Sequence, residues 1–286
     1  MNKVCAVVIT YNPELERLFE NVNSVLPQVD ELLIVDNGSK NLTDFETKLK
    51  SLANFKYTLI SLNENKGIGF ALNQAVLYCK DNNFDYLFTL DQDSIITVGL
   101  ISGLFDTILS DTDIAMVGPK ICDVNELVSN SCEGNLLEVN HLITSGALCR
   151  VSCLESVGGF NERLFIDCVD FDMSLKLREK GYRVVRDNRF KLIHEIGKKE
   201  RKTFFNRHFY LLNHSDVRVY YMVRNRICLV RRYRKLKNYR PLLDLKHLVT
   251  RTLAMLVYEQ HKTAKLVATF KGIYDGLVNY SFIMKR

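Results

Sequence analysis

The chain has 286 residues, of which 47% are hydrophobic and 25% are charged. That balance is typical of a globular protein and excludes a disordered or fibrous chain, and the length suffices for one large domain or two smaller ones. The formal net charge is +6, and the segment between Arg224 and Arg251 holds many lysines and arginines but a single acid, Asp244. Such a segment predicts an anionic partner, namely phosphate, nucleic acid or an anionic membrane surface, with a solvated helix face as the alternative.

The eight cysteines are scattered along the chain and form no CxxC pair. Scattered thiols favour a reducing compartment, and the first residues predict a strand rather than a secretory leader. No apolar run approaches the length that crosses a bilayer. We therefore expect a cytoplasmic protein that binds peripherally to the inner face of the cytoplasmic membrane through its basic C-terminal segment.

The first third of the chain alternates short apolar runs with helical periodicity. Runs of β-branched and aromatic residues predict strands, and apolar residues three and four positions apart predict helices. Strands and helices that alternate in this way form a parallel sheet with helices on both faces. We expect strands at residues 4–10, 31–35, 57–62 and 86–90, and helices at 13–25 and 70–80.

The middle of the chain is less regular, and its last part is helical. Short apolar runs predict strands at 115–118 and 182–186. Two helical patterns end at glycine, which often terminates a helix. We expect these helices at 152–157 and 172–180. After about residue 220 the pattern becomes helical and basic.

Polar residues follow three of the early strands, at the edge where open parallel sheets bind ligands. Asn12 follows the first strand, and Asp36 ends the second before a turn signal. Asp36 suits a hydrogen bond to a base or ribose, or alternatively an Asx turn.

Asp91 and Asp93 follow the fourth strand, and alternation in an extended segment sends both carboxylates to one side. There they repel unless a cation or proton lies between them, and Mg²⁺ or Mn²⁺ shared with a diphosphate suits such oxygens, with a solvated turn as the alternative.

A second acidic cluster places Asp167, Asp170 and Asp172 among apolar side chains. Asp172 suits the N-cap or first turn of the following helix, and Asp170 is expected to project from a loop at the helix start. Acids among apolar neighbours cost desolvation energy, so we expect one of them to have a chemical task, such as that of a general base. Capping combined with solvation is the alternative.

Two further patterns are less specific. Gly67 and Gly69 suggest a dinucleotide-binding loop, but Leu72 stands where the third glycine belongs and the loop follows the third strand rather than the first. Small residues before a helix can still approach a phosphate closely. His194 follows an apolar run where structural histidines are common, and its place after the second acidic cluster also suits a metal ligand.

Five short motifs lie in order between residues 3 and 230. They are Val7-Val-Ile-Thr-Tyr-Asn12, Val35-Asp-Asn-Gly-Ser39, Asn65-Lys-Gly-Ile-Gly69, Leu90-Asp-Gln-Asp-Ser94 and Asp170-Phe-Asp172. Each is weak alone, but in this order and spacing the chain resembles a family 2 glycosyltransferase with the GT-A fold. In that resemblance, the last motif aligns with the segment that holds the catalytic base.

Within that family the chain looks most like bacterial rhamnosyltransferases, which use dTDP-L-rhamnose and act on lipid-linked glycans for surface polysaccharide such as O-antigen or capsule. Most family members carry a Glu-Asp pair at the base, whereas Val169 precedes Asp170 here and Asp167 lies three residues earlier. The base assignment therefore stays open between Asp170 and Asp167, and we favour Asp170. The closer match rests on Leu90-Asp-Gln-Asp-Ser94, Phe165-Ile-Asp167 with Val169-Asp170, and Tyr220-Tyr-Met-Val-Arg-Asn225.

The resemblance implies an α/β chain with the GT-A fold, in which a Rossmann-like, mostly parallel sheet is flanked by helices and followed by a basic helical C-terminal segment. It implies a nucleotide-sugar-binding half at residues 1–115 and an acceptor-binding, catalytic half of the same domain at 116–230. Residues 231–286 are expected to form the basic helical extension.

The resemblance also implies how the donor is held. Asp36 is expected to contact the base or ribose, with Thr10 and Asn12 beside it. Arg224 suits a diphosphate of the donor or of a lipid acceptor, because a guanidinium pairs with two oxygens at once, and an ordinary surface arginine is the alternative. The other residues assigned to the donor are Asn65, Lys66, Gly67 and Asp91.

The implied reaction is an inverting single displacement that depends on a divalent cation, Mg²⁺ or Mn²⁺. Asp93 is expected to bind the ion, Asp91 to bind the ribose or a metal-bound water, and His194 to complete the coordination. The ion neutralises the departing diphosphate. Asp170, or alternatively Asp167, removes the proton from the acceptor hydroxyl.

Other functions remain open from the sequence. The same fold can use a galactofuranose, glucose or N-acetylglucosamine nucleotide, because sugar choice depends on the shape of the pocket. A non-catalytic scaffold that binds a nucleotide sugar is an alternative of another class, against which the intact acids Asp93 and Asp170 argue. Nucleic acid is not an expected partner, because the basic segment lacks regular aromatic interleaving. We expect a nucleotide-sugar donor, a lipid-linked or oligosaccharide acceptor and an anionic membrane surface.

Overall fold

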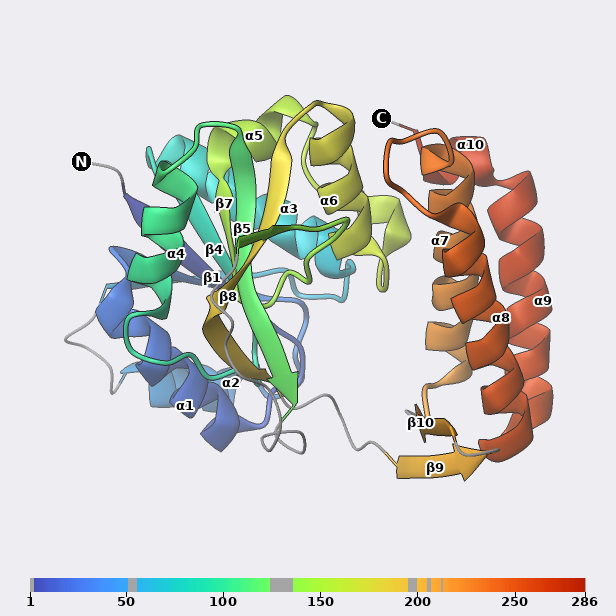
Figure 1. Cartoon of the computed structure of the whole chain (residues 1–286). Coiled ribbons are helices and arrows are strands. Elements are labelled where there is room, and N and C mark those ends of the chain that lie inside the picture. Colours follow the sequence, from blue (N-terminus) through green and yellow to red (C-terminus); the bar gives the residue numbers. More distant parts are fainter. Residues whose placement is uncertain are drawn as a thin grey trace. The chain divides into compact units, whose positions relative to one another are not determined.

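The computed structural model describes residues 3–50, 56–123, 136–194, 200–204, 207–211 and 213–285 (Figure 1). Packing divides the chain into two compact units. We call the first, Met1–Glu162 with Asp170–Glu195, the sheet unit, and the second, Arg163–Val169 with Ile196–Arg286, the helical unit. The functional halves expected from the sequence follow other boundaries and remain a prediction.

In the described residues of the sheet unit, eight strands form one sheet. The strands are β1 (Val4–Thr10), β2 (Glu31–Asp36), β3 (Tyr57–Ser61), β4 (Tyr86–Asp91), β5 (Ile114–Asp123), β6 (Leu136–Glu138), β7 (Ala147–Arg150) and β8 (Arg183–His194). Their order is β3-β2-β1-β4-β7-β5-β8-β6. Strands β3, β2, β1 and β4 pair in parallel, as do β5 and β8, whereas β7 and β6 are antiparallel to their neighbours. The predicted mostly parallel sheet is confirmed.

Helices cover both faces of this sheet (Figure 1). On one face, Val8, Ile34 and Phe88 pack in a buried core with α1, α2 and α4. On the other, α3 contacts β1, β2 and β4. Because both faces are covered, the strands read as continuous apolar runs rather than alternating ones. The helices of this part are α1 (Leu15–Val25), α2 (Leu42–Leu49), α3 (Ile68–Asp81), α4 (Leu100–Leu109), α5 (Val151–Ser156) and α6 (Val169–Glu179), with short 3₁₀ turns at Leu26–Gln28 and Glu162–Leu164.

The middle of the chain departs most from the sequence prediction. β5 and β8 run well beyond the predicted 115–118 and 182–186, because the two strands pair with each other through Asp123 and His194. That pairing joins distant segments, which local apolar content does not reveal. α6 begins at Val169 rather than at residue 172, so Asp170 and Asp172 both lie in its first turn, where the helix dipole favours acids. The expectation that Asp170 projects from a loop is therefore wrong.

The helical unit contains three long helices, within the part of the chain that the structure describes. α7 starts after Ser215, whose side chain accepts a hydrogen bond from the backbone N–H of Arg218 at 3.3 Å. None of the described helices is both long and apolar enough to cross a membrane. The elements are the hairpin β9 (Glu200–Phe204) and β10 (Arg207–Leu211), followed by α7 (Asp216–Tyr233), α8 (Pro241–Tyr258), α9 (Lys262–Val278) and the short α10 (Tyr280–Ile283).

Glycines set the contact between α7 and α9. A Cβ atom at Gly272 would lie 2.8 Å from the carbonyl oxygen of Tyr220, and one at Gly276 would lie 2.9 Å from that of Arg224. Neither distance is tolerable for a real side chain, so the two helices approach this closely only because both positions are glycine. The buried face of α9 is consequently made largely of small residues: Ala268, Thr269, Gly272 and Gly276, with Lys265.

We expect Gly272→Leu to lower the free energy of unfolding by about 1–3 kcal/mol, because the added side chain meets the α7 backbone rather than a flexible neighbour. The matched control is Ala264→Leu, which adds the same side chain at an exposed position of the same helix. Thermal unfolding of both variants measures the difference. Equal melting temperatures for the two variants would contradict the close packing of α7 and α9.

Candidate active site

The carboxyl ends of β1, β2 and β4 meet at one edge of the sheet, as the sequence predicts. Thr10 pairs in register with Asp36, and Ile9 pairs with Asp91. Asp36 is fully buried. The hydroxyl of Thr10 donates to its Oδ1 at 3.0 Å, and the backbone N–H groups of Gly38 and Ser39 donate to its Oδ2 at 3.1 and 2.9 Å. Asp36 thus makes the Asx turn considered as the alternative, and its contact with a donor stays a prediction.

Asn12 holds the loop after β1 against the loop after β2. Its backbone N–H donates to the Ser39 hydroxyl, and its Oδ1 accepts from the Lys40 N–H, both at 2.8 Å. Its φ of 46° is in the left-handed region, which asparagine adopts more readily than most residues. Asn12 therefore shapes the loop edge next to Asp36, where the sequence places the donor.

The glycine loop after β3 is tied to the same edge by Asn37, which sequence reasoning did not single out. Asn37 donates to Asn65 Oδ1 at 3.1 Å and accepts from the Lys66 N–H at 2.9 Å. Asn65 Oδ1 also accepts from the Gly67 N–H at 3.0 Å. The structure therefore brings Asn65, Lys66 and Gly67, which are predicted to bind the sugar donor, close to Asp36. Asn37 makes this link, and its only signal in the sequence was its place in the Val35–Ser39 motif.

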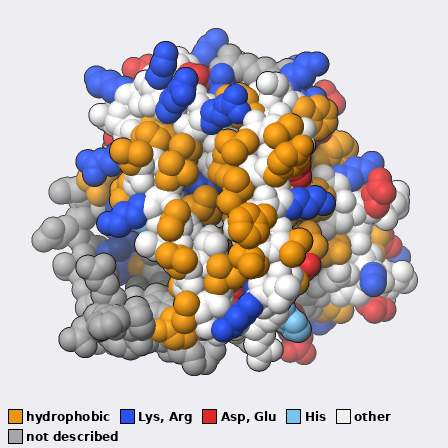
Figure 2. Space-filling view, turned by 90° about the vertical axis from the view of Figure 1, so that its right-hand side faces the viewer, with side chains coloured by type: hydrophobic (Ala, Val, Ile, Leu, Met, Phe, Trp, Pro, Cys, Tyr) orange, Lys and Arg blue, Asp and Glu red, His pale blue; other side chains and the backbone are white. Residues whose placement is uncertain are grey.

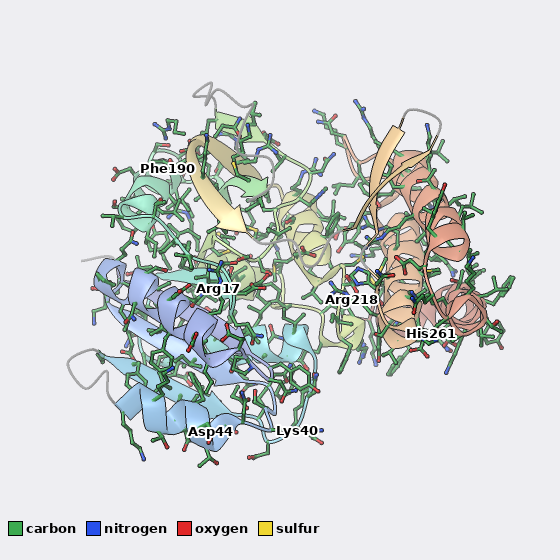
Figure 3. The ribbon with its side chains drawn as sticks, turned by 90° about the horizontal axis from the view of Figure 1, so that it is seen from below. Arg17, Lys40, Asp44, Phe190, Arg218 and His261 are labelled. Carbon is green, nitrogen blue, oxygen red and sulfur yellow. The ribbon has the colours of Figure 1, made fainter. Side chains whose placement is uncertain are left out.

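The acidic pair after β4 lies in a turn rather than in an extended segment. β4 ends at Asp91, and the Ser94 N–H donates to the Asp91 carbonyl at 3.2 Å. The argument that strand alternation sends both carboxylates to one side is therefore wrong. α1 fixes the turn: Asn21 donates to the Asp91 carbonyl at 2.8 Å, and Arg17, labelled in Figure 3, donates to the Asp93 carbonyl at 2.9 Å. Buried Asn21 was missed from the sequence, where it marks a polar position on the apolar face of a helix.

Asp93 carries the clearest sign of a ligand at this edge. Its Oδ1 is buried and has no hydrogen-bond partner among the described residues. A buried carboxylate oxygen left in that state is costly, and a bound cation removes the cost. The described residues contain no group of three His, Cys, Asp or Glu side chains placed to hold a metal. Mg²⁺, however, is usually held by one or two carboxylates with substrate phosphates and water, so the buried carboxylate of Asp93 fits such an ion. The expected part of Asp91 stays a prediction.

The structure describes only the backbone of His194, which ends β8 opposite Asp123. Its predicted role as a metal ligand lies outside the described side chains and stays a prediction.

The loop that carries Asp167 is clamped by α7 within the helical unit. The amide of Asn225, which is fully buried, donates to the carbonyls of Leu164, Ile166 and Asp167 at 2.8, 2.9 and 2.9 Å. The loop needs such a clamp because Phe165, Asp167 and Cys168 all have a positive φ, between 61° and 65°.

Arg224 takes part in the same clamp. Its Nη2 donates to the Arg163 carbonyl at 2.6 Å, and its Nε donates to Asn225 Oδ1 at 2.9 Å. The guanidinium carbon lies 4.6 Å from the ring centroid of Tyr221. With 8% of its surface exposed, Arg224 is not an ordinary surface arginine. Its predicted diphosphate contact is untested.

Charges around Asp167 are mainly positive. Arg218, labelled in Figure 3, donates to the two carboxylate oxygens of Asp167 at 3.1 and 3.4 Å. Burial, together with Arg218 and Arg251, lowers the pKa of His214 to about 3, so this imidazole is neutral near pH 7. The Nη2 of Arg251 lies 2.8 Å from His214 Nε2, and the neutral ring accepts from the guanidinium. Asp167 is therefore engaged in an ion pair before any acceptor binds.

Asp170, by contrast, sits in the first turn of α6. Its Oδ1 accepts from the backbone N–H of Phe171 at 2.8 Å. The Phe171 ring stacks on His141 with 3.8 Å between ring centroids. A carboxylate at a helix N-terminus is stabilised as the anion, which is the form that accepts a proton.

Solved structures share this architecture. The chain is similar to the mannosyltransferase PcManGT from Pyrobaculum calidifontis in complex with GDP-Man and Mn²⁺, with a TM-score of 0.62 and 16% identity over 98% of this chain and 86% of that one. It is also similar to S. aureus TarS 1–349 in complex with UDP, with a TM-score of 0.60 and 15% identity over 99% and 81% of the two chains. The fold is the GT-A fold of glycosyltransferases, as predicted.

Sequence comparison is more specific than the fold. Residues 5–146 match the family model described as glycosyl transferase family 2. Over 258 residues the chain is 31% identical to the dTDP-rhamnosyl transferase RfbF of Shigella flexneri. The aligned region covers 85% of this chain and 83% of that protein. The chain belongs to glycosyltransferase family 2.

We expect Asn225→Ala to lower the free energy of unfolding by roughly 1–3 kcal/mol, because it removes the buried amide that donates to the carbonyls of Leu164, Ile166 and Asp167 in the strained loop. Thr250→Ala, at an exposed position of α8, is the control and should change stability by less than about 0.5 kcal/mol. Urea unfolding measures both. An Asn225→Ala protein as stable as the control would refute the clamp.

Proposed function

We propose that the chain transfers L-rhamnose from dTDP-L-rhamnose to a lipid-linked glycan acceptor during bacterial surface-polysaccharide synthesis, such as that of O-antigen or capsule. The observation that carries this donor is the 31% identity to a dTDP-rhamnosyl transferase over most of both chains. The polar edge formed by the loops after β1, β2 and β3 supports it, because it is the place where an open α/β sheet binds a nucleotide. Thr10, Asn12 and Asp36 are the residues that we assign to its base and ribose.

Asp93 and Asp91 are the residues that would hold a divalent cation, and His194 is a further candidate. When bound, Mg²⁺ or Mn²⁺ supplies positive charge to a departing diphosphate. The buried Oδ1 of Asp93, which has no hydrogen-bond partner in the described part of the chain, supports this assignment. The relative PcManGT was solved with Mn²⁺, which is consistent with the proposal but belongs to that protein.

We assign the general base to Asp170 rather than to Asp167. The Arg218 ion pair already occupies both oxygens of Asp167, so that carboxylate would have to give up hydrogen bonds before it accepted a proton. Asp167 then positions the loop that leads into α6. An inverting displacement needs only one base, which takes the proton from the acceptor hydroxyl as its oxygen attacks the anomeric carbon.

Two rival functions keep most of this geometry. A different nucleotide sugar would use the same edge, because the sugar is selected by pocket shape. A non-catalytic scaffold would bind the donor without needing Asp170. The proposed location is cytoplasmic, at the inner face of the membrane where a lipid-linked acceptor is reached, with the basic C-terminal segment against anionic lipid.

We expect dTDP-L-rhamnose with Mg²⁺ to raise the melting temperature of the full chain, and EDTA to abolish the shift, because a ligand that binds only the folded state stabilises it by about 2.7 kcal/mol at 100 times its Kd. Asp93→Asn should lose the metal-dependent part, and Glu16→Gln, an exposed acid on α1, should keep it. A shift with UDP-glucose or UDP-galactose alone would replace the donor. No shift with any nucleotide sugar would overturn the proposed function.

We expect Asp170→Asn to lower kcat on the order of 10²-fold or more, since it removes the base. Asp167→Asn should lower kcat less, because that side chain acts through the loop. The measurement is transfer of labelled rhamnose from the dTDP donor to lipid-linked glycan extracted from bacterial membranes. Both variants should keep the donor-induced melting shift. Near-full turnover in Asp170→Asn with loss in Asp167→Asn would move the base to Asp167.

A further inference from the structure

In α9 the small residues are buried and the large apolar residues are exposed, which is the opposite of an ordinary surface helix. The buried face of α9 is small and partly polar, with Gly272 and Gly276 against α7. A surface helix normally buries its large apolar side chains and exposes polar ones. Here the large apolar residues are the exposed ones: Leu266, Val267, Phe270, Ile273, Tyr274, Leu277 and Val278, between 36% and 63% exposed.

Neighbouring helices extend this surface. In α8, exposed apolar residues recur along one side of the helix, and Phe282 of α10 is 65% exposed. Figure 2 shows these side chains gathered on one face, with lysines and arginines along its border. We call this surface the apolar face; its α8 members are Leu242, Leu243, Val249, Leu253 and Val257. A contiguous exposed apolar surface bordered by charge marks a place where a protein binds another protein or a membrane.

Within residues 231–285, which carry the apolar face, the exposed charges have one sign. Residues 231–285 contain three acids, and none is exposed. Asp244 accepts from Tyr239 and pairs with Arg226, Glu259 pairs with Lys265, and Asp275 accepts from Tyr220. The exposed charged residues of this segment are all basic: Arg231, Arg234, Lys235, Lys237, Arg240, Lys246, Arg251, Lys262, Lys271 and Lys285. Each carboxylate of residues 231–285 is thus at least partly buried and has a hydrogen-bond or ion-pair partner, whereas most of the lysines and arginines are exposed.

We propose that the apolar face enters the headgroup region of an anionic lipid bilayer, with α8 and α9 lying along the membrane and the exposed lysines and arginines contacting lipid phosphates. An amphipathic surface with apolar and aromatic side chains on the inserted side and basic side chains around it binds in this way. Phe270 and Phe282 supply apolar rings to the inserted side. The amphipathic ring of Tyr274 favours the zone between headgroups and water. This inference refines the membrane contact of the proposed function and rests on it for the lipid-linked acceptor.

A second copy of the chain fits the apolar face less well. Two identical faces in a symmetric dimer contact each other, so each cationic border would meet the other. Like charges brought together in that way oppose association, whereas anionic headgroups neutralise them. The charge pattern therefore selects a lipid surface over self-association.

The test is flotation of the full chain with vesicles of phosphatidylcholine alone and of phosphatidylcholine with about 30% phosphatidylglycerol, without donor or acceptor. We expect binding to the anionic vesicles only, falling as salt is raised. Phe270→Ser with Tyr274→Ser should lower the partition coefficient at least about tenfold, because two exposed aromatic rings no longer insert. Leu77→Ser with Val98→Ser, which removes two exposed apolar side chains of the sheet unit, should leave it unchanged.

Each outcome decides the proposal. Absence of flotation with anionic vesicles overturns it, as does flotation that Phe270→Ser with Tyr274→Ser leaves unchanged, since binding would then be purely electrostatic. A dimer detected by light scattering without vesicles, and broken by the same variant, assigns the apolar face to self-association instead. The donor-induced melting shift should be the same in this variant and the parent. Loss of membrane binding with that shift intact separates this inference from the proposed transferase activity.

Discussion

The arrangement of the loops at the polar edge depends on the buried carboxylate of Asp36, which needs hydrogen-bond donors. Asp36 ends a strand that is covered on both faces, so its charge cannot be left without donors, and it finds them in the Thr10 hydroxyl and two backbone N–H groups. Those bonds fix the turn after β2. Asn37, the next residue, then fixes the glycine loop after β3. The polar edge is therefore one hydrogen-bonded assembly, and its shape depends on satisfying a single buried acid.

The turn after β4 is built by a different route. Two of its backbone carbonyls accept hydrogen bonds from Asn21 and Arg17 of α1, which tie the turn to that helix. The buried Oδ1 of Asp93 nevertheless has no donor among the residues that the structure describes. Such an arrangement is tolerated when the stability of the surrounding elements offsets it, and it is typical of a site prepared for a ligand.

The early half of the fold could be predicted from the sequence because its signals are local. Continuous apolar runs mark β1, β2 and β4, and each run is followed by polar residues and a turn. The second half could not be predicted so well. The length of β8 depends on pairing with β5, and the start of α6 depends on a loop held by Asn225, which lies about 60 residues further along the chain.

The candidate site divides in the same way. Asp36, Asp91 and Asp93 could be proposed from the sequence because carboxylates directly after predicted parallel strands indicate a ligand site. Asn21 and Asn37 were missed because an asparagine gives no such signal until its partners are known. Arg224 was assigned by residue type to a phosphate, whereas in the structure its guanidinium donates to the carbonyls of Arg163 and Leu164, in the loop that carries Asp167.

In α9 the residues that pack against the protein, among them Gly272 and Gly276, are not the large apolar ones. In an ordinary amphipathic helix, the large apolar residues hold the helix to its domain, so changing them changes stability. Here small residues make the contact with α7, and the large ones face outward. The outer side chains are consequently free to diverge in size and number during evolution. Related chains can differ widely at these positions while the helix keeps its place, so sequence drift there is expected to follow the surroundings of the protein rather than its fold.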